Sequence, residues 1–347
     1  MSTSTSTCTP TPTPASKPKS KTKAAPAPAP ALPLSSLSLT FLGTASAQPS
    51  ATRNLSALAL RVGGALWLFD CGEGTQRQMQ RARGVRMGRV EKVFITHTHG
   101  DHIFGLIPLM ASRLNGAGGM VDAGEDTRAA DAAVAKETIP PLEIYGPPGT
   151  RAYVRTGLTY THTLLGAPYV VHELHFPPST PFPFPTTPDL GLPPHPLELP
   201  GHDITPAPDG TWPSIFASPE LTVHAAPLPH SVPCIGYADV LVHEATNAHL
   251  PGVDPETKAA DTREGVRERA RSRGHSTPEG AGAFARSVGA RKLVLNHFSA
   301  RYAGDEEGGG EQAGRIMRAI GDLARAEFGG EVVCTRDFMT IDVELSS

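Results

Sequence analysis

The stretch Val93-Phe94-Ile95-Thr96-His97-Thr98-His99-Gly100-Asp101-His102 decides the fold. Its first four residues are apolar or β-branched, which predicts a short buried strand. Three histidines and one aspartate then follow within six positions. Imidazole nitrogens and carboxylate oxygens are ligands of zinc in proteins. We therefore interpret the stretch as a metal site at the end of a strand, and not as a polar loop that merely contains histidines.

The spacing of these four side chains predicts how they divide between ions. His97 and His99 are two residues apart, so in an extended backbone they share one face and can bind one ion. Gly100 permits a turn that directs Asp101 and His102 toward a second ion. The apolar residues that follow recur at helical spacing, so a helix is expected directly after the motif.

Length and composition fit one large folded unit. The chain has 347 residues, of which 39% are hydrophobic, enough for one large core. The net charge of −3 predicts no general affinity for polyanions, so any nucleic-acid contact must come from a local patch. The four cysteines are widely spaced without a CxxC pair, which is typical of reduced thiols. No apolar run approaches membrane-spanning length, so no membrane association is expected.

Composition also predicts where the folded part lies. Residues 1–36 consist mainly of Ser, Thr, Pro, Ala and Lys, and we expect a disordered tail there. Residues 37–347 are expected to form one domain with two insertions. The first, near 115–140, is rich in Gly, Ala and Asp. The second, at 176–219, is rich in proline and predicts an irregular excursion.

Hydrophobic periodicity and turn residues predict the remaining elements. Thr75 is expected to be an N-cap, and Thr277 or Ser276 is expected to cap a helix that begins with Pro278. The polar, charged stretch before Gly274 has no predicted element. Strands are expected at residues 37–41, 56–62, 65–70, 142–145, 221–225, 238–243, 292–296 and 332–343, and helices at 76–82, around 153–158 and at 311–327.

Several further motifs accompany the metal motif in a fixed order. They are Phe41-Leu42-Gly43-Thr44, Phe69-Asp70-Cys71-Gly72-Glu73-Gly74-Thr75-Gln76, Tyr145-Gly146-Pro147-Pro148-Gly149, Pro229-His230-Ser231, His243-Glu244-Ala245-Thr246, Gly274-His275-Ser276-Thr277 and Asn296-His297-Phe298-Ser299-Ala300-Arg301-Tyr302. With these motifs the chain resembles the short-form tRNase Z family. Members of this family are tRNA 3′-end endonucleases of the metallo-β-lactamase superfamily. The resemblance implies an α/β fold, an αββα sandwich with metals at one sheet edge, and makes 37–347 a catalytic domain.

The resemblance also implies roles for individual residues. It assigns one zinc ion to three histidines, which are His97, His99 and His230. It assigns a second zinc ion to one aspartate and two histidines, which are Asp101, His102 and His297. Asp101 would also act as general base, His275 would protonate the leaving oxygen, and Glu244 would orient His275.

The chain departs from the family pattern after Tyr237. The family carries several tens of residues there, whereas Tyr237 runs directly into Ala238-Asp239-Val240. The absent segment would include an aspartate that bridges both zinc ions and an arm that grips the tRNA elbow. We therefore expect a deletion at 237/238, a weaker second zinc site and fewer phosphate contacts. Asp261-Thr262-Arg263 resembles the aspartate segment, but it stands at the wrong place in the chain.

The resemblance predicts a zinc-dependent endoribonuclease that removes the 3′ trailer from precursor tRNA and leaves a 3′-hydroxyl. Two alternatives remain open. One is another phosphodiesterase of the same fold that acts on a small molecule. The other is a catalytically impaired variant that binds RNA or a partner. The predicted partners are precursor tRNA and, by the same resemblance, a second copy in a homodimer. The nucleus or cytoplasm is the default compartment, with the mitochondrion also open.

Overall fold

The computed structural model describes residues 36–115, 139–177, 180, 191–218, 221–237, 241–304 and 310–344. The tail predicted over 1–36 lies outside these residues except for its last position. Most of the insertion predicted near 115–140 also lies outside them, as do residues 238–240 at the predicted deletion.

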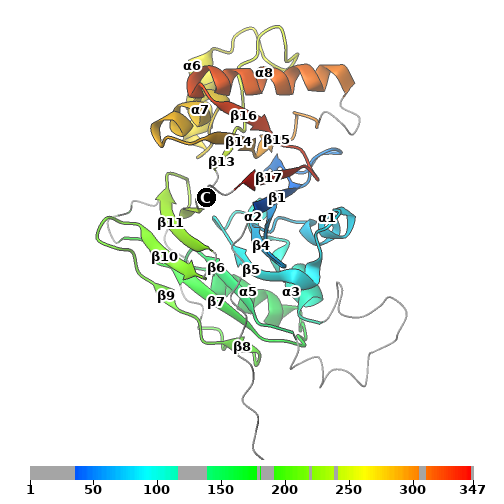
Figure 1. Ribbon diagram of the computed structural model, residues 1–347, viewed down its shortest axis with the longest axis vertical. Helices are drawn as coiled ribbons and strands as arrows, with labels where there is room; N and C mark the ends of the chain where they lie inside the picture. The colour runs from blue at the N-terminus through cyan, green and yellow to red at the C-terminus, as the bar shows by residue number, and fades with distance from the viewer. Residues whose placement is uncertain are drawn as a thin grey trace, which may run out of the picture. The chain divides into compact units, whose positions relative to one another are not determined.

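A large mixed sheet forms the centre of the fold (Figure 1). Its strands are, in spatial order, β17 (Thr340–Glu344), β1 (Ser36–Gly43), β3 (Ala57–Val62), β4 (Ala65–Phe69), β5 (Val90–Phe94), β6 (Leu142–Gly146), β7 (Tyr169–Leu174) and β8 (Glu198–Leu199), and β9 (Asp203–Ile204) also pairs with β7. Pairing is antiparallel from β17 to β4 and parallel from β4 onward. The strands predicted at 37–41, 56–62, 65–70 and 142–145 are confirmed.

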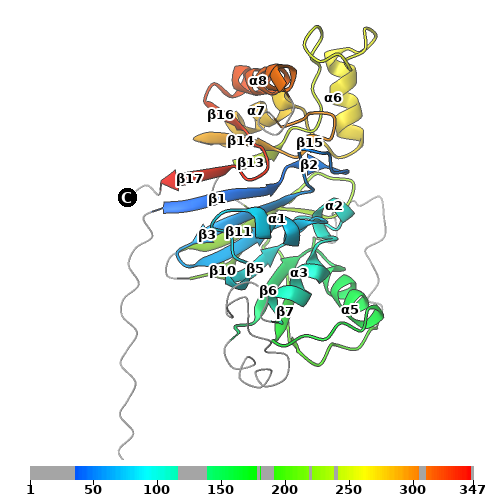
Figure 2. The same cartoon turned by 90° about the vertical axis from the view of Figure 1, so that its right-hand side faces the viewer.

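Alternating side chains give this sheet two apolar faces. On β3, Ala57 and Ala59 face one core, whereas Leu58 and Leu60 face another. The first core is covered by helices α1 (Thr75–Arg81), α3 (Leu106–Arg113) and α5 (Thr150–Tyr160) (Figure 2). The short elements η1 (Met87–Arg89) and α2 (Gly100–Ile103) flank β5.

The second core lies between the large sheet and two three-stranded sheets. One contains β10 (Trp212–Ala217), β11 (Thr222–Leu228) and β12 (Cys234–Tyr237), and the other contains β13 (Leu241–Glu244), β14 (Lys292–Asn296) and β16 (Glu331–Cys334). Helices α7 (Pro278–Ser287) and α8 (Gly310–Phe328) pack on β14 and β16 (Figure 2). The short strands β2 (Ala45–Ser46) and β15 (Phe298–Ser299) pair with each other. These layers confirm the predicted αββα sandwich.

Several local predictions were wrong. Gly74, with φ of +79°, is the N-cap of α1, and the hydroxyl of Thr75 instead donates to the Gly72 carbonyl. The proline-rich segment, predicted to be irregular, includes strands β8, β9 and β10. Trp212 is fully buried and fixes β10 in the core between the sheets. The stretch 332–343 divides between β16 and β17, which belong to different sheets. A helix, α6 (Arg263–Ser272), occupies the polar stretch before Gly274, with Thr262 as its N-cap.

The second layer is interrupted where the deletion is predicted. β12 ends at Tyr237 and β13 begins at Leu241, and these two strands belong to different sheets with no pairing between their described residues. A cavity of about 1930 Å³ is lined by both strands and by the inner face of the large sheet. His230 and His275 also line this cavity. Of the helices that the structure describes, none is long and apolar enough to span a bilayer.

One buried cation connects segments that are distant in the sequence. Arg53 is 1% exposed, and its guanidinium donates to the carbonyls of Tyr302 and Thr335 at 2.7 and 2.9 Å. It also donates to the hydroxyl of Thr44 at 2.7 Å and lies over the ring of Phe298. Arg53 thus links the loop after β2 to the segments that follow β14 and β16.

Replacing Arg53 by alanine should lower the free energy of unfolding by about 3 kcal/mol or more, because three buried acceptors lose their donor. Urea unfolding followed by circular dichroism measures the change. Arg315→Ala is the control, since it removes only an exposed pair with Glu311 and should cost less than about 0.5 kcal/mol. Equal losses in the two variants would contradict the role given to Arg53.

Candidate metal centre

Three histidines meet at the sheet edge where β5 ends. His97 and His99 follow β5, and His230 follows β11 and Pro229. One ring nitrogen from each of the three lies within 4.8 Å of the others. Burial holds the pKa of His97 well below its ordinary value and lowers the pKa of His99, and it lowers that of His230 to about 4. These rings are therefore neutral at pH 7, which is the form that binds a metal.

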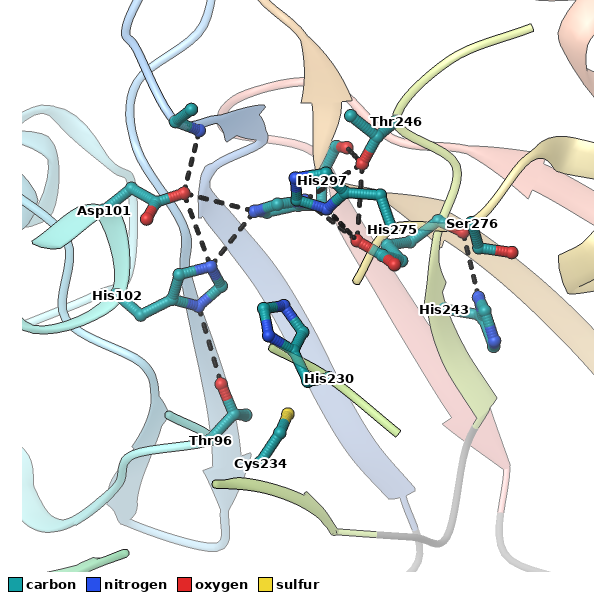
Figure 3. A network of polar contacts seen from close by, with 12 residues as sticks. Thr96, Asp101, His102, His230, Cys234, His243, Thr246, His275, Ser276 and His297 are labelled. Carbon is teal, nitrogen blue, oxygen red and sulfur yellow. Dashed lines mark hydrogen bonds and ion pairs between the residues drawn. The ribbon is translucent and has the colours of Figure 1, made fainter. Parts of the chain in front are cut away.

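A second group joins the two halves of the chain. Asp101 and His102 lie on α2, and His297 follows β14. The Nε2 atoms of His102 and His297 are 3.0 Å apart, and they lie 3.5 and 3.3 Å from Asp101 Oδ2. Figure 3 shows these three side chains pointing toward one another. The backbone N–H of Ala47 donates to the same oxygen at 2.8 Å.

Two ring nitrogens at this distance require a cation or a proton between them, since two lone pairs would repel. Burial favours the neutral form of His102, but the carboxylates of Asp70 and Asp101 outweigh burial and raise its pKa to about 10. Burial also opposes the charge on Asp101, yet hydrogen bonds from His102 and His297 hold its pKa below its usual range. The group is therefore built around a positive charge, which a divalent metal supplies when it displaces the proton.

Supporting side chains fix the orientation of His102. Asp70 Oδ2 lies 2.7 Å from His102 Nδ1, which leaves Nε2 directed at the centre. Asp70 Oδ1 in turn accepts from the backbone N–H of Thr96 at 2.8 Å and lies 2.9 Å from its hydroxyl. Asp70 and His297 both have positive φ, 61° and 56°, which is strained for residues other than glycine. The sequence pattern predicts Asp70 only as the end of a strand, although Asp70 lies within the Phe69–Gln76 motif.

A third group adjoins His297. Glu244 ends β13, and its Oε2 lies 3.0 Å from His275 Nδ1 and 3.3 Å from His297 Nδ1. Thr246 donates to Glu244 at 3.3 Å and to the carbonyl of His297 at 2.9 Å. Burial raises the pKa of Glu244, but hydrogen bonds from His275 and His297 reverse this and lower it. Sequence reasoning missed Thr246 as a functional residue, although it belongs to the His-Glu-Ala-Thr motif.

Two glycines permit the close packing around these groups. A Cβ atom at Gly72 would lie 2.4 Å from the Asp101 carbonyl. Gly274 has φ of +76°, and a Cβ there would lie 3.0 Å from the backbone nitrogen of Ser231. Any larger residue at these positions would displace the backbone next to the clustered side chains.

The structure thus brings together every site residue predicted from the sequence. Another group of potential ligands consists of Glu173 on β7, His175 directly after that strand and Asp203 on β9. Arg151 forms ion pairs with both carboxylates of that group, which offsets half of their negative charge without a metal. Burial raises the pKa of the Cys234 thiol, which lies 3.9 Å from His97 Nδ1, so that thiol is a poor ligand.

The chain is similar to several known proteins. Residues 37–117 match a family model described as Anti-Pycsar protein Apyc1. A ribonuclease BN from Cronobacter sakazakii is 34% identical, with 78% of this chain and 91% of that protein aligned. A ribonuclease Z from Trichodesmium erythraeum is 32% identical, over 77% and 85%. The crystal structure of human tRNase Z, short form (ELAC1), superposes with a TM-score of 0.60 at 30% identity, covering 88% of this chain and 98% of that one.

The chain belongs to the tRNase Z family of the metallo-β-lactamase superfamily. The match to the human tRNase Z covers 88% of this chain, whereas the Apyc1 model matches only residues 37–117, which include the His-x-His-x-Asp-His motif. The two ligand groups of this tRNase Z family member therefore form a candidate metal centre between its two halves.

Purified protein should contain at least one equivalent of a divalent metal, because the three-histidine group offers neutral ligands on fixed strand ends. Elemental analysis by mass spectrometry measures this. His97→Ala and His230→Ala should each lose the metal, whereas His162→Asn, at an exposed position away from the centre, should keep it. Less than half an equivalent in folded wild-type protein would contradict the assignment.

Proposed function

We propose that this chain is a zinc-dependent endoribonuclease that removes the 3′ trailer from precursor tRNA and leaves a tRNA 3′-hydroxyl. The observation that carries the proposal is the Glu244–His275 pair beside two convergent ligand groups. The His275 ring centroid is 6.0 Å from that of His230 and 5.5 Å from that of His297, so it adjoins one member of each group. The family membership supports tRNA as substrate, because the human relative with matching sequence and fold is a tRNase Z.

The ligands present fit zinc. His97, His99 and His230 would hold one ion, a three-ligand set that leaves a position open. Asp101, His102 and His297 would hold the second. Zinc at these positions would lower the pKa of water toward neutrality and would offset the charge of a phosphodiester.

Two proton transfers are then assigned to different residues, one to Asp101 and the other to His275. Asp101 is fixed by Ala47 N–H and two histidines, and we assign it as the general base that takes a proton from the attacking water. His275 Nδ1 is held by Glu244, which leaves Nε2 to donate a proton to the departing ribose 3′-oxygen. Glu244 stabilises the protonated ring before that transfer.

A second candidate is a catalytically impaired member of the family that still binds RNA. The observation that favours it is the interruption between β12 and β13, where the cavity opens. We propose that residues 37–347 form the catalytic domain, with a deletion at 237/238. A segment of several tens of residues would fill this space and would supply a carboxylate to bridge both ions. Without it the second zinc site is weaker.

We further propose that precursor tRNA is the partner, that two copies associate as a homodimer, and that the chain acts in the nucleus or cytoplasm. Sedimentation of the purified protein tests the dimer independently of catalysis.

His275→Ala should slow trailer cleavage by about two to four orders of magnitude, which is the usual contribution of a positioned acid–base group. Glu244→Gln should slow it less, because the amide can still accept from the imidazole. Cleavage of a 3′-extended transcript under single-turnover conditions measures both rates, and elemental analysis checks that metal content is unchanged. Loss of metal in step with activity would instead make His275 a ligand.

Restoring a segment of the family between Tyr237 and Ala238 should raise cleavage of precursor tRNA by about a hundredfold or more, because a misplaced reacting group costs that much. Hydrolysis of bis-p-nitrophenyl phosphate requires the metals but no RNA-binding surface. It therefore distinguishes a defect in the metal centre from a defect in RNA binding. Equal cleavage of precursor tRNA by both forms would show that the deletion is harmless. Restoration of tRNA cleavage alone would assign the defect to RNA binding.

A further inference from the structure

Helix α6 carries an unusual concentration of positive charge next to His275. Residues 263–273 contain five arginines and two glutamates, a net charge of 5 − 2 = +3 in a chain whose total is −3. The arginines are Arg263, Arg267, Arg269, Arg271 and Arg273, and all of them are exposed. The helix runs directly into Gly274 and His275, so this charge lies beside the proposed proton donor.

The arginines form two rows, and each row lines a different hollow next to His275. Arg267 and Arg271 are four residues apart, and both line the large cavity together with His275. Arg269 and Arg273 are also four residues apart, and both line a separate hollow of about 170 Å³ that again includes His275. His275 is therefore shared by two hollows, each of which presents one row of guanidinium groups.

Most of this charge is available to a ligand. The side chains of Arg271 and Arg273 make no hydrogen bond or ion pair with any described residue. Arg267 lies 3.9 Å from Glu264, a distance at the limit of an exposed ion pair. Two of the five have a close carboxylate partner: Arg269 lies 2.6 Å from Asp261 and Arg263 lies 2.8 Å from Glu279, and their side chains remain 57% and 59% exposed.

Resting on the function proposed above, we infer that α6 is a phosphate-binding helix that contacts the RNA backbone on both sides of the scissile bond. One row, Arg267 and Arg271, contacts phosphates on one side of His275, and the other row, Arg269 and Arg273, contacts phosphates on the opposite side. Guanidinium groups suit this role because their paired N–H donors match phosphate oxygens. The net negative charge of the chain gives no general attraction to RNA, so a local positive patch of this kind is needed to attract the phosphates.

Arginines in the last turn of a helix also stabilise the helix itself, because they interact with its carbonyl end. That role predicts a lower thermal midpoint after their removal and no change in RNA binding. Binding and stability must therefore be measured on the same variants.

The test compares two double variants, Arg267→Gln/Arg271→Gln and Arg269→Gln/Arg273→Gln, by fluorescence anisotropy with a 3′-extended precursor tRNA between 50 and 200 mM salt. Each should lower the slope of log affinity against log salt by about 1.4–1.8, the value for two lost phosphate contacts. The control, Arg315→Gln/Arg325→Gln on α8, removes the same charge outside both hollows and should leave the slope unchanged. Lysine at the same positions should retain most of the slope.

Mature tRNA without a trailer separates the two sides. With this ligand only one of the two double variants should lower the slope, because the phosphates on the trailer side are absent. Unchanged slopes with precursor tRNA in both variants, or a fall in thermal midpoint alone, would overturn the inference. Equal effects of both variants on mature tRNA would place both rows on one side and would overturn it too. Because binding is measured without cleavage, a wild-type protein that binds but does not cleave would refute the proposed function and not this inference.

Discussion

The approach of His102 and His297 is the contact on which the rest of the structure depends. Their Nε2 atoms lie 3.0 Å apart beside Asp101 Oδ2, although the two histidines are 195 residues apart in the chain. Such an arrangement is stable only with positive charge at its centre. It also requires α2, which follows β5 of the large sheet, to meet the end of β14 from the other half of the sandwich. The active edge is therefore where the two halves are joined.

Maintaining this contact imposes costs elsewhere in the fold. Asp70 and His297 adopt left-handed backbone conformations, the Asp70 carboxylate is buried and the Glu244 carboxylate is half-buried. Each cost is offset by hydrogen bonds from neighbouring groups, including Thr96 and Thr246. Arg53 adds a second link between the halves through its hydrogen bonds to the carbonyls of Tyr302 and Thr335. The result is a preorganised set of ligands whose ring orientations are fixed by neighbouring carboxylates and hydroxyls.

Some of this could be predicted from the sequence because it depends on local pattern. The His-x-His-x-Asp-His motif follows an apolar strand, so the sequence pattern alone predicts the ligand cluster and its place at a strand end. The convergence of His230 and His297 was not, since it depends on long-range sheet order and entered through the family resemblance. Helix α6 was missed because only Val266 and Ala270 are buried, which leaves too weak an apolar stripe. The supporting role of Asp70 depends on a tertiary contact that spacing does not encode.

Anomalous diffraction from crystals of the metal-loaded protein, with data collected on both sides of the zinc absorption edge, would locate the metal centre directly. We expect an anomalous peak among His97, His99 and His230, and a weaker one among Asp101, His102 and His297. The second should be weaker because the interruption after Tyr237 leaves that ion with fewer carboxylates. Absence of anomalous density at the three-histidine group in zinc-loaded crystals would contradict the central claim that the two halves of the sandwich meet at a metal centre.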